Sequence, residues 1–422
     1  MSKPKTVVVV ATLDTKGKEA EFIKDKIAAQ GIDTILIDSG ILGSPTVKAT
    51  ISRNAVAQAA GVTTQALKEQ GQKSVAIAKQ SEGLSNIVKA LLVENKLDGI
   101  IGIGGGQGTS ICTTAMQALP VGLPKLMLST VASGRFRFGP YVGDKDICMM
   151  FSVTDIAGLN AISRPILDNA ANAIAGMVLH KRPNPPAEKP AIAITMLGIT
   201  TPCVMRIKAS LETMGYDVVA FHASGSGGAA MEELIEAGKF VAVLDLSTHE
   251  LINHLNGGLA GTPGRLEAIT RTSIPAVISV GGIDVLAFES NEKTPKKYLN
   301  RPFAAHNAQI IHVRPSPKEM SQAAQVMVNR LNKALGPTLV TLPLKGFSDL
   351  NQEGRALWGA AGNRALIETL QAGLRPEIPL VQVDAHINDP EFADVNAACM
   401  ARLIQGESPA DVAAQFDNVG EK

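Results

Sequence analysis

Short runs of apolar, β-branched residues alternate along the chain with segments whose apolar residues recur every three or four positions. Residues 7–11 (VVVVA) are typical of a strand buried on both faces. The next segment, residues 19–29, places Ala20, Ile23 and Ile27 on one helical face. Further strands are predicted at residues 34–37, 99–103 and 125–129. Strands that alternate with helices predict βαβ units and a parallel sheet.

The same order of elements restarts after a proline-rich stretch, residues 181–190 (KRPNPPAEKP). Proline fixes φ and lacks an amide hydrogen, so this stretch is interpreted as a linker. Four later strands mirror the earlier ones, at residues 191–197, 218–222, 240–246 and 275–280. The tail from Gly336 is expected to add a strand, a long helix around Trp358, a strand at residues 379–383 and a last helix.

The sequence therefore predicts an α/β fold with two doubly wound, Rossmann-like parallel-sheet domains in tandem. Residues 1–183 are expected to form an N-terminal nucleotide-binding domain. Residues 190–422 are expected to form a C-terminal domain of similar topology with extra C-terminal elements.

Composition narrows the class of protein. Lys and Arg number 40 against 39 Asp and Glu, and aromatic residues make up only 4%, so the clustered charge and stacking rings of a nucleic-acid platform are missing. No apolar run is long enough for a membrane span or a signal peptide. The four cysteines form no CxxC pair and are expected to be free thiols in a reducing compartment. We therefore expect a cytoplasmic protein without nucleic-acid or membrane partners.

Polar residues follow the first predicted strand in a loop at residues 12–18 (TLDTKGK). In open parallel sheets, ligands bind beyond the carboxyl ends of the strands. Hydroxyls of Thr12 and Thr15 and the amine of Lys16 suit an anion at a helix N-terminus, with Asp14 as a Mg²⁺ ligand. Ordinary helix capping by Asp14 or Thr15 is the alternative.

A glycine-rich loop at residues 102–110 (GIGGGQGTS) follows an internal strand. Such glycines let a phosphate approach the backbone amides, and a hydroxyl at the next helix start adds a donor. The residues concerned are Gly104, Gly105, Gly106, Gly108 and Thr109. The loop is neither a Walker A sequence nor a clean dinucleotide fingerprint, and a turn that needs glycine for geometry alone is the alternative.

A third loop at residues 129–137 (STVASGRFR) combines hydroxyls, a glycine and two arginines. Arginine can grip a phosphate through two parallel hydrogen bonds. Ser129, Ser133, Gly134 and Arg135 are the candidate ligand contacts, and arginines on a solvated loop are the alternative.

The second half places titratable residues at predicted strand ends, where they could act as acid, base or metal ligand. These candidates are His222, His249, Glu250, Asp284 and His306. We expect His249 to transfer protons, with Glu250 or Asp284 orienting its ring. No HExxH-type spacing joins two of them into a metal site, and a structural histidine is the alternative. Cys203 lies in a similar loop.

Six motifs in order along nearly the whole chain resemble the ATP-binding domain family named after the tomato protein that resists tomato mosaic virus. They are VATLDTKGKE, GIGGGQGTS, LMLSTVASG, MLGITTPCV, FHASGSGGAAME and STHEL. The resemblance implies a two-subdomain α/β protein that binds ATP and forms a homodimer or higher homo-oligomer. The plant relative also carries a barrel-type domain that this chain lacks, so the resemblance implies a separate barrel-type partner protein. It implies no reaction.

Three functions are therefore open. The first is ATP binding by the N-terminal domain, with Mg²⁺ at Asp14. The second is a hydrolase or lyase that acts on a small anionic metabolite through the His, Asp and Glu loops of the C-terminal domain. The third is a protein-interaction module that a nucleotide stabilises.

Overall fold

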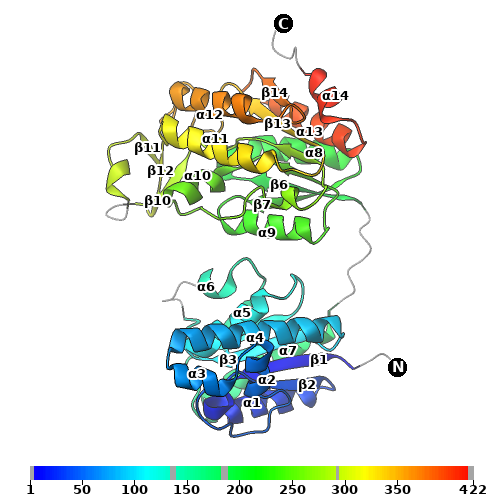
Figure 1. The fold of residues 1–422 in the computed structure, drawn as a ribbon, viewed down its shortest axis with the longest axis vertical. Coiled ribbons are helices and arrows are strands. Elements are labelled where there is room, and N and C mark those ends of the chain that lie inside the picture. The colour runs from blue at the N-terminus through cyan, green and yellow to red at the C-terminus, as the bar shows by residue number, and fades with distance from the viewer. Residues whose placement is uncertain (1–3, 134–138, 182–188, 291–293, 417–422) are drawn as a thin grey trace. The chain divides into compact units, whose positions relative to one another are not determined.

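The computed structural model describes residues 4–133, 139–181, 189–290 and 294–416 (Figure 1). The chain divides into two compact units, residues 1–183 and 184–422. One unit holds a five-stranded sheet of order β2-β1-β3-β4-β5, and the other a six-stranded sheet of order β14-β13-β9-β8-β6-β7. All strand pairs in both sheets are parallel. The expected α/β fold of two Rossmann-like parallel-sheet domains in tandem is confirmed.

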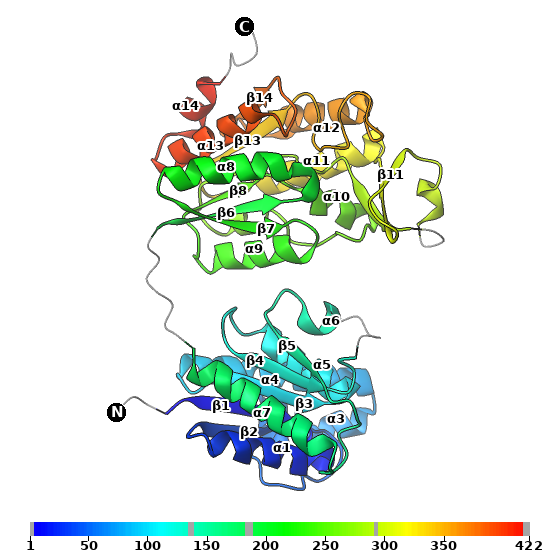
Figure 2. The same ribbon diagram turned by 180° about the vertical axis from the view of Figure 1, so that it is seen from behind.

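Helices cover both faces of the first unit's sheet. Its strands are β1 (Thr6–Ala11), β2 (Asp33–Asp38), β3 (Gly99–Gly104), β4 (Lys125–Ser129) and β5 (Cys148–Phe151). Its helices are α1 (Leu13–Ala28), α2 (Arg53–Ala59), α3 (Thr64–Gln70), α4 (Lys73–Val93), α5 (Gly106–Gln117), α6 (Gly139–Val142) and α7 (Ser163–Leu179). Figure 1 shows α4 and α5 in front of the sheet, and Figure 2 shows α1 and α7 on its opposite face.

Strand β1 shows why the sequence forms this arrangement. Val7 and Val9 pack with α1 and α7, whereas Val8 and Val10 pack with α4 and α5. All four side chains are fully buried. Alternate residues of a strand point to opposite faces, so a continuous apolar run is what a sheet covered on both sides requires.

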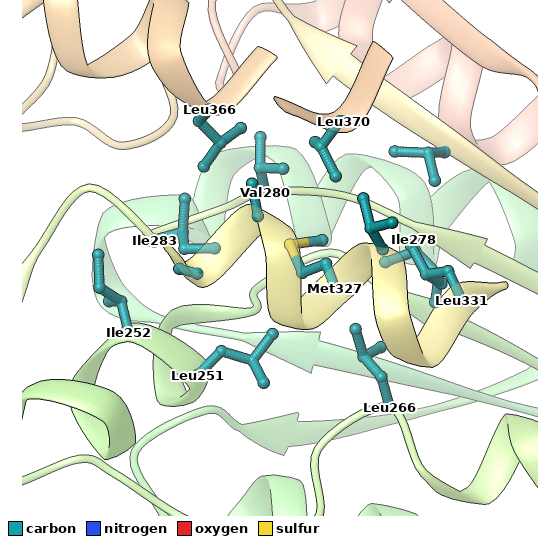
Figure 3. Close-up of a cluster of buried hydrophobic side chains, with 14 of the residues drawn as sticks. Leu251, Ile252, Leu266, Ile278, Val280, Ile283, Met327, Leu331, Leu366 and Leu370 are labelled. Atoms are coloured by element: carbon teal, nitrogen blue, oxygen red, sulfur yellow. The ribbon is translucent and has the colours of Figure 1, made fainter. Parts of the chain in front are cut away.

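The second unit repeats this plan and extends it. Its parallel strands are β6 (Ala191–Met196), β7 (Asp217–His222), β8 (Ala242–Asp245), β9 (Ala276–Ile278), β13 (Thr338–Pro343) and β14 (Leu380–Val383). Its helices are α8 (Thr201–Thr213), α9 (Ser226–Glu236), α10 (His249–Asn256), α11 (Pro317–Leu331), α12 (Ala360–Gly373), α13 (Pro390–Ile404) and α14 (Pro409–Ala414). Helix α11 lies at the centre of one core, where Met327 and Leu331 are surrounded by Leu251, Leu266 and Leu366 (Figure 3).

An antiparallel sheet of order β10-β12-β11 was not anticipated from the sequence. Its strands are β10 (Leu286–Glu289), β11 (Phe303–Ala305) and β12 (Ile310–Val313). They are too short to produce a clear alternating pattern, so periodicity gave no signal for them.

Two other expectations were wrong. The segment after β1 is not a loop, because α1 begins at Leu13, whose amide donates to Asp38 Oδ1 (3.1 Å). Trp358 lies before helix α12 and not within it. Most of the expected linker, residues 182–188, lies outside the described residues.

Candidate functional site

A cavity of about 510 Å³ lies in the first unit, at the carboxyl ends of its strands. The strand order reverses between β1 and β3, and such a reversal is where doubly wound sheets bind ligands. The volume suits a small-molecule site. The lining residues are Thr12, Asp14, Thr15, Lys16, Ser39, Gly40, Ile41, Leu42, Leu67, Lys68, Gly71, Gln72, Lys73, Ala76, Gly105, Gly106, Gln107, Gly108 and Ile111. Seven of them were candidates from the sequence.

Residues 12–18, the first of the expected ligand loops, are held in place by contacts with distant residues of the unit. Lys16 has non-helical φ and ψ (−130° and 21°), and its Nζ donates to the Ile156 carbonyl oxygen (2.9 Å). Asp14 Oδ2 accepts the Gly43 amide (3.0 Å) and lies 3.9 Å from Arg53 Nη1. Asp14 therefore anchors the segment that follows β2, and its side chain is not the cap of its own helix.

The glycine-rich loop contains glycines with different structural needs. A Cβ on Gly104 would lie 2.8 Å from the Gly108 backbone, so the turn from β3 into α5 has no room for a side chain there. A Cβ on Gly106 would meet no atom within 4 Å. The N-cap residue of α5, Gly105, contributes no side-chain cap. The first turn of α5 therefore lines the cavity and has no side-chain cap on its amides.

The two predicted hydroxyls near this loop bond to each other. Thr109 Oγ1 and Ser129 Oγ are 2.6 Å apart and both residues are fully buried. Ser129 Oγ also accepts the Val131 amide (3.1 Å). They join α5 to β4 and do not line the cavity, and neither does Ser133 or Gly104. Gly134 and Arg135 lie outside the described residues.

Two lysines at the cavity were missed by the sequence reasoning. Lys68 on α3 and Lys73 at the start of α4 line it, and both are exposed. They come from helices between β2 and β3, whereas the sequence reasoning considered only strand ends. With Lys16 they set three ammonium groups against the single carboxylate of Asp14 in the lining. The cavity therefore favours an anion.

A metal would have to share its ligands with a bound molecule. Over the part of the chain that the structure describes, no group of three or more His, Cys, Asp or Glu side chains could hold one. Asp14 alone supplies one carboxylate. Mg²⁺ is commonly held by one or two carboxylates together with substrate phosphates, so Asp14 fits that arrangement only when a phosphate is bound.

Glu250, expected in a catalytic site, belongs to a buried ion cluster. Arg265 is fully buried and contacts Glu250 (2.5 Å), Asp245 (2.7 Å) and Glu232 (2.6 Å). The other oxygen of Glu250 accepts the amides of Gly225 and Gly228. Burial raises the pKa of Glu250, although the guanidinium of Arg265 opposes this rise. Each oxygen of this carboxylate is occupied, so Glu250 has a structural role.

His249 and Asp284 are also buried and bonded separately. His249 Nδ1 lies 2.8 Å from the Gly282 carbonyl oxygen, which can only accept, so Nδ1 donates. Burial lowers the pKa of His249 to about 4. Asp284 Oδ2 accepts the Ser348 hydroxyl (2.7 Å), and burial raises the pKa of Asp284. The expectation that Glu250 or Asp284 orients the ring of His249 is wrong.

The remaining candidates of the second unit do not complete a site. His222 and His306 are exposed, and the ring of His306 stacks on His312 at 4.7 Å. Among the described residues, no hydrogen bond joins any two of His222, His249, Glu250 and Asp284. Cys203 is 1% exposed and burial raises its thiol pKa, so it is not a reactive nucleophile.

At the strand-order reversal of the second unit, between β6 and β8, several protein segments contact one another. The carbonyl oxygen of Ile199 accepts the Asp349 amide (3.1 Å) and Asn388 Nδ2 (3.0 Å). A Cβ on Gly281 would lie 2.5 Å from the Leu246 oxygen and 2.9 Å from Ile387. The extra C-terminal segments of the second unit thus pack at the sheet edge that corresponds to the cavity edge of the first unit.

Family models match nearly the whole length of this chain. The N-terminal domain model of the uncharacterised protein family UPF0261 matches residues 5–183, and its C-terminal domain model matches residues 189–404. The chain belongs to the UPF0261 family.

Relatives support this assignment. A UPF0261 protein of Clostridium tetani is 40% identical over 95% of this chain and 99% of its own length. The ToMV resistance protein Tm-1(GCR237) of Solanum lycopersicum is 36% identical over 76% of this chain and 44% of its own length. The UPF0261 chain therefore resembles less than half of the tomato protein.

Solved structures are only distantly similar to the UPF0261 chain. A thioesterase domain from the curacin biosynthetic pathway has a TM-score of 0.26 and 11% identity over 53% of this chain and 93% of its own. A UDP-GlcNAc 2-epimerase of Methanocaldococcus jannaschii has a TM-score of 0.21 and 11% identity over 87% of this chain and 100% of its own. Similarity this low carries no functional argument. Among the described residues, no helix is long and apolar enough to span a membrane.

Proposed function

We propose that the cavity of the first unit binds ATP. The phosphates lie at the N-terminus of α5, where Gly105, Gly106 and Gly108 form part of the lining. Backbone amides at a helix N-terminus point at an anion, and the helix dipole favours negative charge there. Lys16 and Lys73 supply the countercharge, and Asp14 would help to hold a Mg²⁺ that neutralises part of the phosphate charge.

The observation that carries this proposal is the space at Gly106. Glycine is ordinarily needed where φ is positive or where a Cβ would clash with protein. Gly106 is helical and its Cβ would meet nothing within 4 Å, so neither reason applies to it. Close approach of a phosphate to the backbone gives glycine a function at this position.

The rest of the cavity suits a nucleoside. The apolar lining comes from Ile41 in the segment after β2 and from Leu67 on α3, Ala76 on α4 and Ile111 on α5. Small-molecule sites combine such apolar walls with a few polar groups that fix orientation. A purine ring can lie against the apolar wall while its phosphates face the lysines.

The test compares two glycines that both have room for a side chain. Gly106→Val places a branched group on the cavity side, and Gly176→Val on α7 places the same group where no atom lies within 4 Å and no cavity residue stands. In calorimetric titration with ATP and Mg²⁺, Gly106→Val should weaken affinity at least about tenfold because the side chain occupies phosphate space. Gly176→Val should bind like the wild type.

Titrations with ADP, GTP and Mg²⁺-free ATP define the ligand further. Failure of the wild type to bind any of these nucleotides contradicts the proposal. If Gly106→Val and the wild type bind ATP with equal affinity, the phosphates do not lie at the N-terminus of α5. The protein contacts already made by Glu250 and Asp284 do not favour the alternative of a hydrolase or lyase in the second unit.

A further inference from the structure

The inner wall of the cavity carries a hydroxyl that the protein does not use. Ser39 follows β2 directly, is fully buried and lines the cavity. Its Oγ has no hydrogen-bond partner among the described residues. A buried hydroxyl without a hydrogen bond costs free energy, so we expect a partner for this group.

The backbone around Ser39 is, in contrast, fixed on every side. The Ser39 amide donates to the Ala11 oxygen (2.9 Å), and the Gly40 amide donates to Asp38 Oδ1 (2.9 Å). Gln80 Nε2 donates to the Gly40 oxygen (2.8 Å). A Cβ on Gly40 would lie 2.5 Å from Arg53 Nη2, so a larger residue at position 40 would collide with the Arg53 side chain. The backbone that carries Ser39 is therefore held in one position.

The charges behind the wall do not favour an anion. Arg53 Nε bonds to Asp38 Oδ2 at 2.6 Å, and Arg53 Nη1 lies 3.9 Å from Asp14 Oδ2. Two carboxylates thus offset one guanidinium. A phosphate is better placed at the lysines and the N-terminus of α5, whereas a neutral group that both donates and accepts suits Ser39.

We propose that Ser39 hydrogen-bonds a sugar hydroxyl of the bound nucleotide, so that the cavity selects ribonucleotides over deoxyribonucleotides. This inference rests on the proposed nucleotide function. A site whose buried polar group pairs with a substrate hydroxyl rejects the analogue that lacks it, because the protein group is then left unpaired.

The experiment measures the affinities of ATP, 2′-deoxy-ATP and 3′-deoxy-ATP by calorimetric titration. The wild type should bind ATP at least about tenfold more tightly than one of the two deoxy analogues. Ser39→Ala should bind ATP about tenfold more weakly and should no longer discriminate between ATP and that analogue. Ser74→Ala, which alters an exposed serine on α4 outside the lining, should match the wild type.

A second measurement separates a ligand contact from a structural serine. Ser39→Ala removes an unpaired buried hydroxyl, so the thermal midpoint of the free protein should stay the same or rise. A clear fall in that midpoint would show that the hydroxyl has a structural partner, and would overturn the inference. Equal affinities of the wild type for ATP and both deoxy analogues would overturn it while leaving nucleotide binding intact. No binding of ATP at all would overturn both proposals.

Discussion

Several titratable side chains of the second unit are buried and bonded to other protein groups, which gives them a structural role. Arg265 neutralises part of a cluster of three carboxylates, and each carboxylate accepts further hydrogen bonds. Removing Arg265 from this cluster would leave three uncompensated buried carboxylates, at a cost of at least roughly 3 to 5 kcal/mol. His249, next to Glu250 in the sequence, is held by a carbonyl oxygen in an equally closed environment.

His249 makes the stability of the second unit dependent on pH. Burial, with a smaller contribution from the charge of His222, lowers its pKa from 6.5 to about 4. As the pH falls below 6.5, His249 binds a proton in the unfolded chain but stays neutral in the folded chain. Stability is therefore lost between pH 6.5 and 4. This loss should reach roughly 3 kcal/mol for His249. His312, whose pKa burial also lowers to about 4, acts in the same window.

His249→Asn isolates the contribution of His249. The amide nitrogen of asparagine can still donate to the Gly282 oxygen, but it does not titrate. Urea unfolding should show the free-energy difference between wild type and variant shrinking as the pH falls from 7 to 4.5. Parallel pH profiles for the two proteins would mean that the ring takes up a proton in the folded state as readily as in the unfolded chain.

At the scale of elements, the junction of β3 and α5 combines a packing requirement with a proposed binding surface. Gly104→Ala should destabilise the protein by about 1 to 3 kcal/mol, because its Cβ meets the Gly108 backbone at 2.8 Å. Gly106→Ala should be neutral or slightly stabilising, because alanine favours the helix and finds open space. Urea unfolding of both variants checks this contrast. Equal destabilisation by both would show that Gly106 is also a packing glycine.

The elements also show where local sequence suffices. The sequence predicted β4 at the residues it occupies, because an apolar run that ends in polar residues has few alternatives in a covered sheet. The start of α1 could not be predicted in this way, since the amide of Leu13 is satisfied by Asp38 from a different strand. The Ser39 amide is likewise held by the Ala11 oxygen of another strand, and Lys68 comes from α3. The ligand contacts expected from the sequence make up seven of the nineteen lining residues, and most of the others come from the segment after β2, from α3, from α4 and from the turn between these two helices.

At the scale of the whole molecule, the chain contains two units with separate cores. Two cores border the sheet of the first unit, and two others border the sheet of the second. The division at residue 183 coincides with the gap between the two family matches. A ligand that binds one folded unit stabilises that unit by mass action and leaves the other unchanged unless the two unfold together.

Calorimetric unfolding should therefore show two transitions, of which ATP raises only one. At about 100 times the dissociation constant, ATP should add about 2.7 kcal/mol to the first unit and raise its midpoint by roughly 5 to 10 °C. Glu250→Gln should lower only the other transition, because it breaks the Arg265 cluster of the second unit. At the same ATP concentration, Gly106→Val should reduce the shift by at least about half while leaving both transitions in place. If a single transition is displaced by both ATP and Glu250→Gln, the two units unfold as one. If ATP instead shifts only the transition that Glu250→Gln lowers, the nucleotide binds to the second unit.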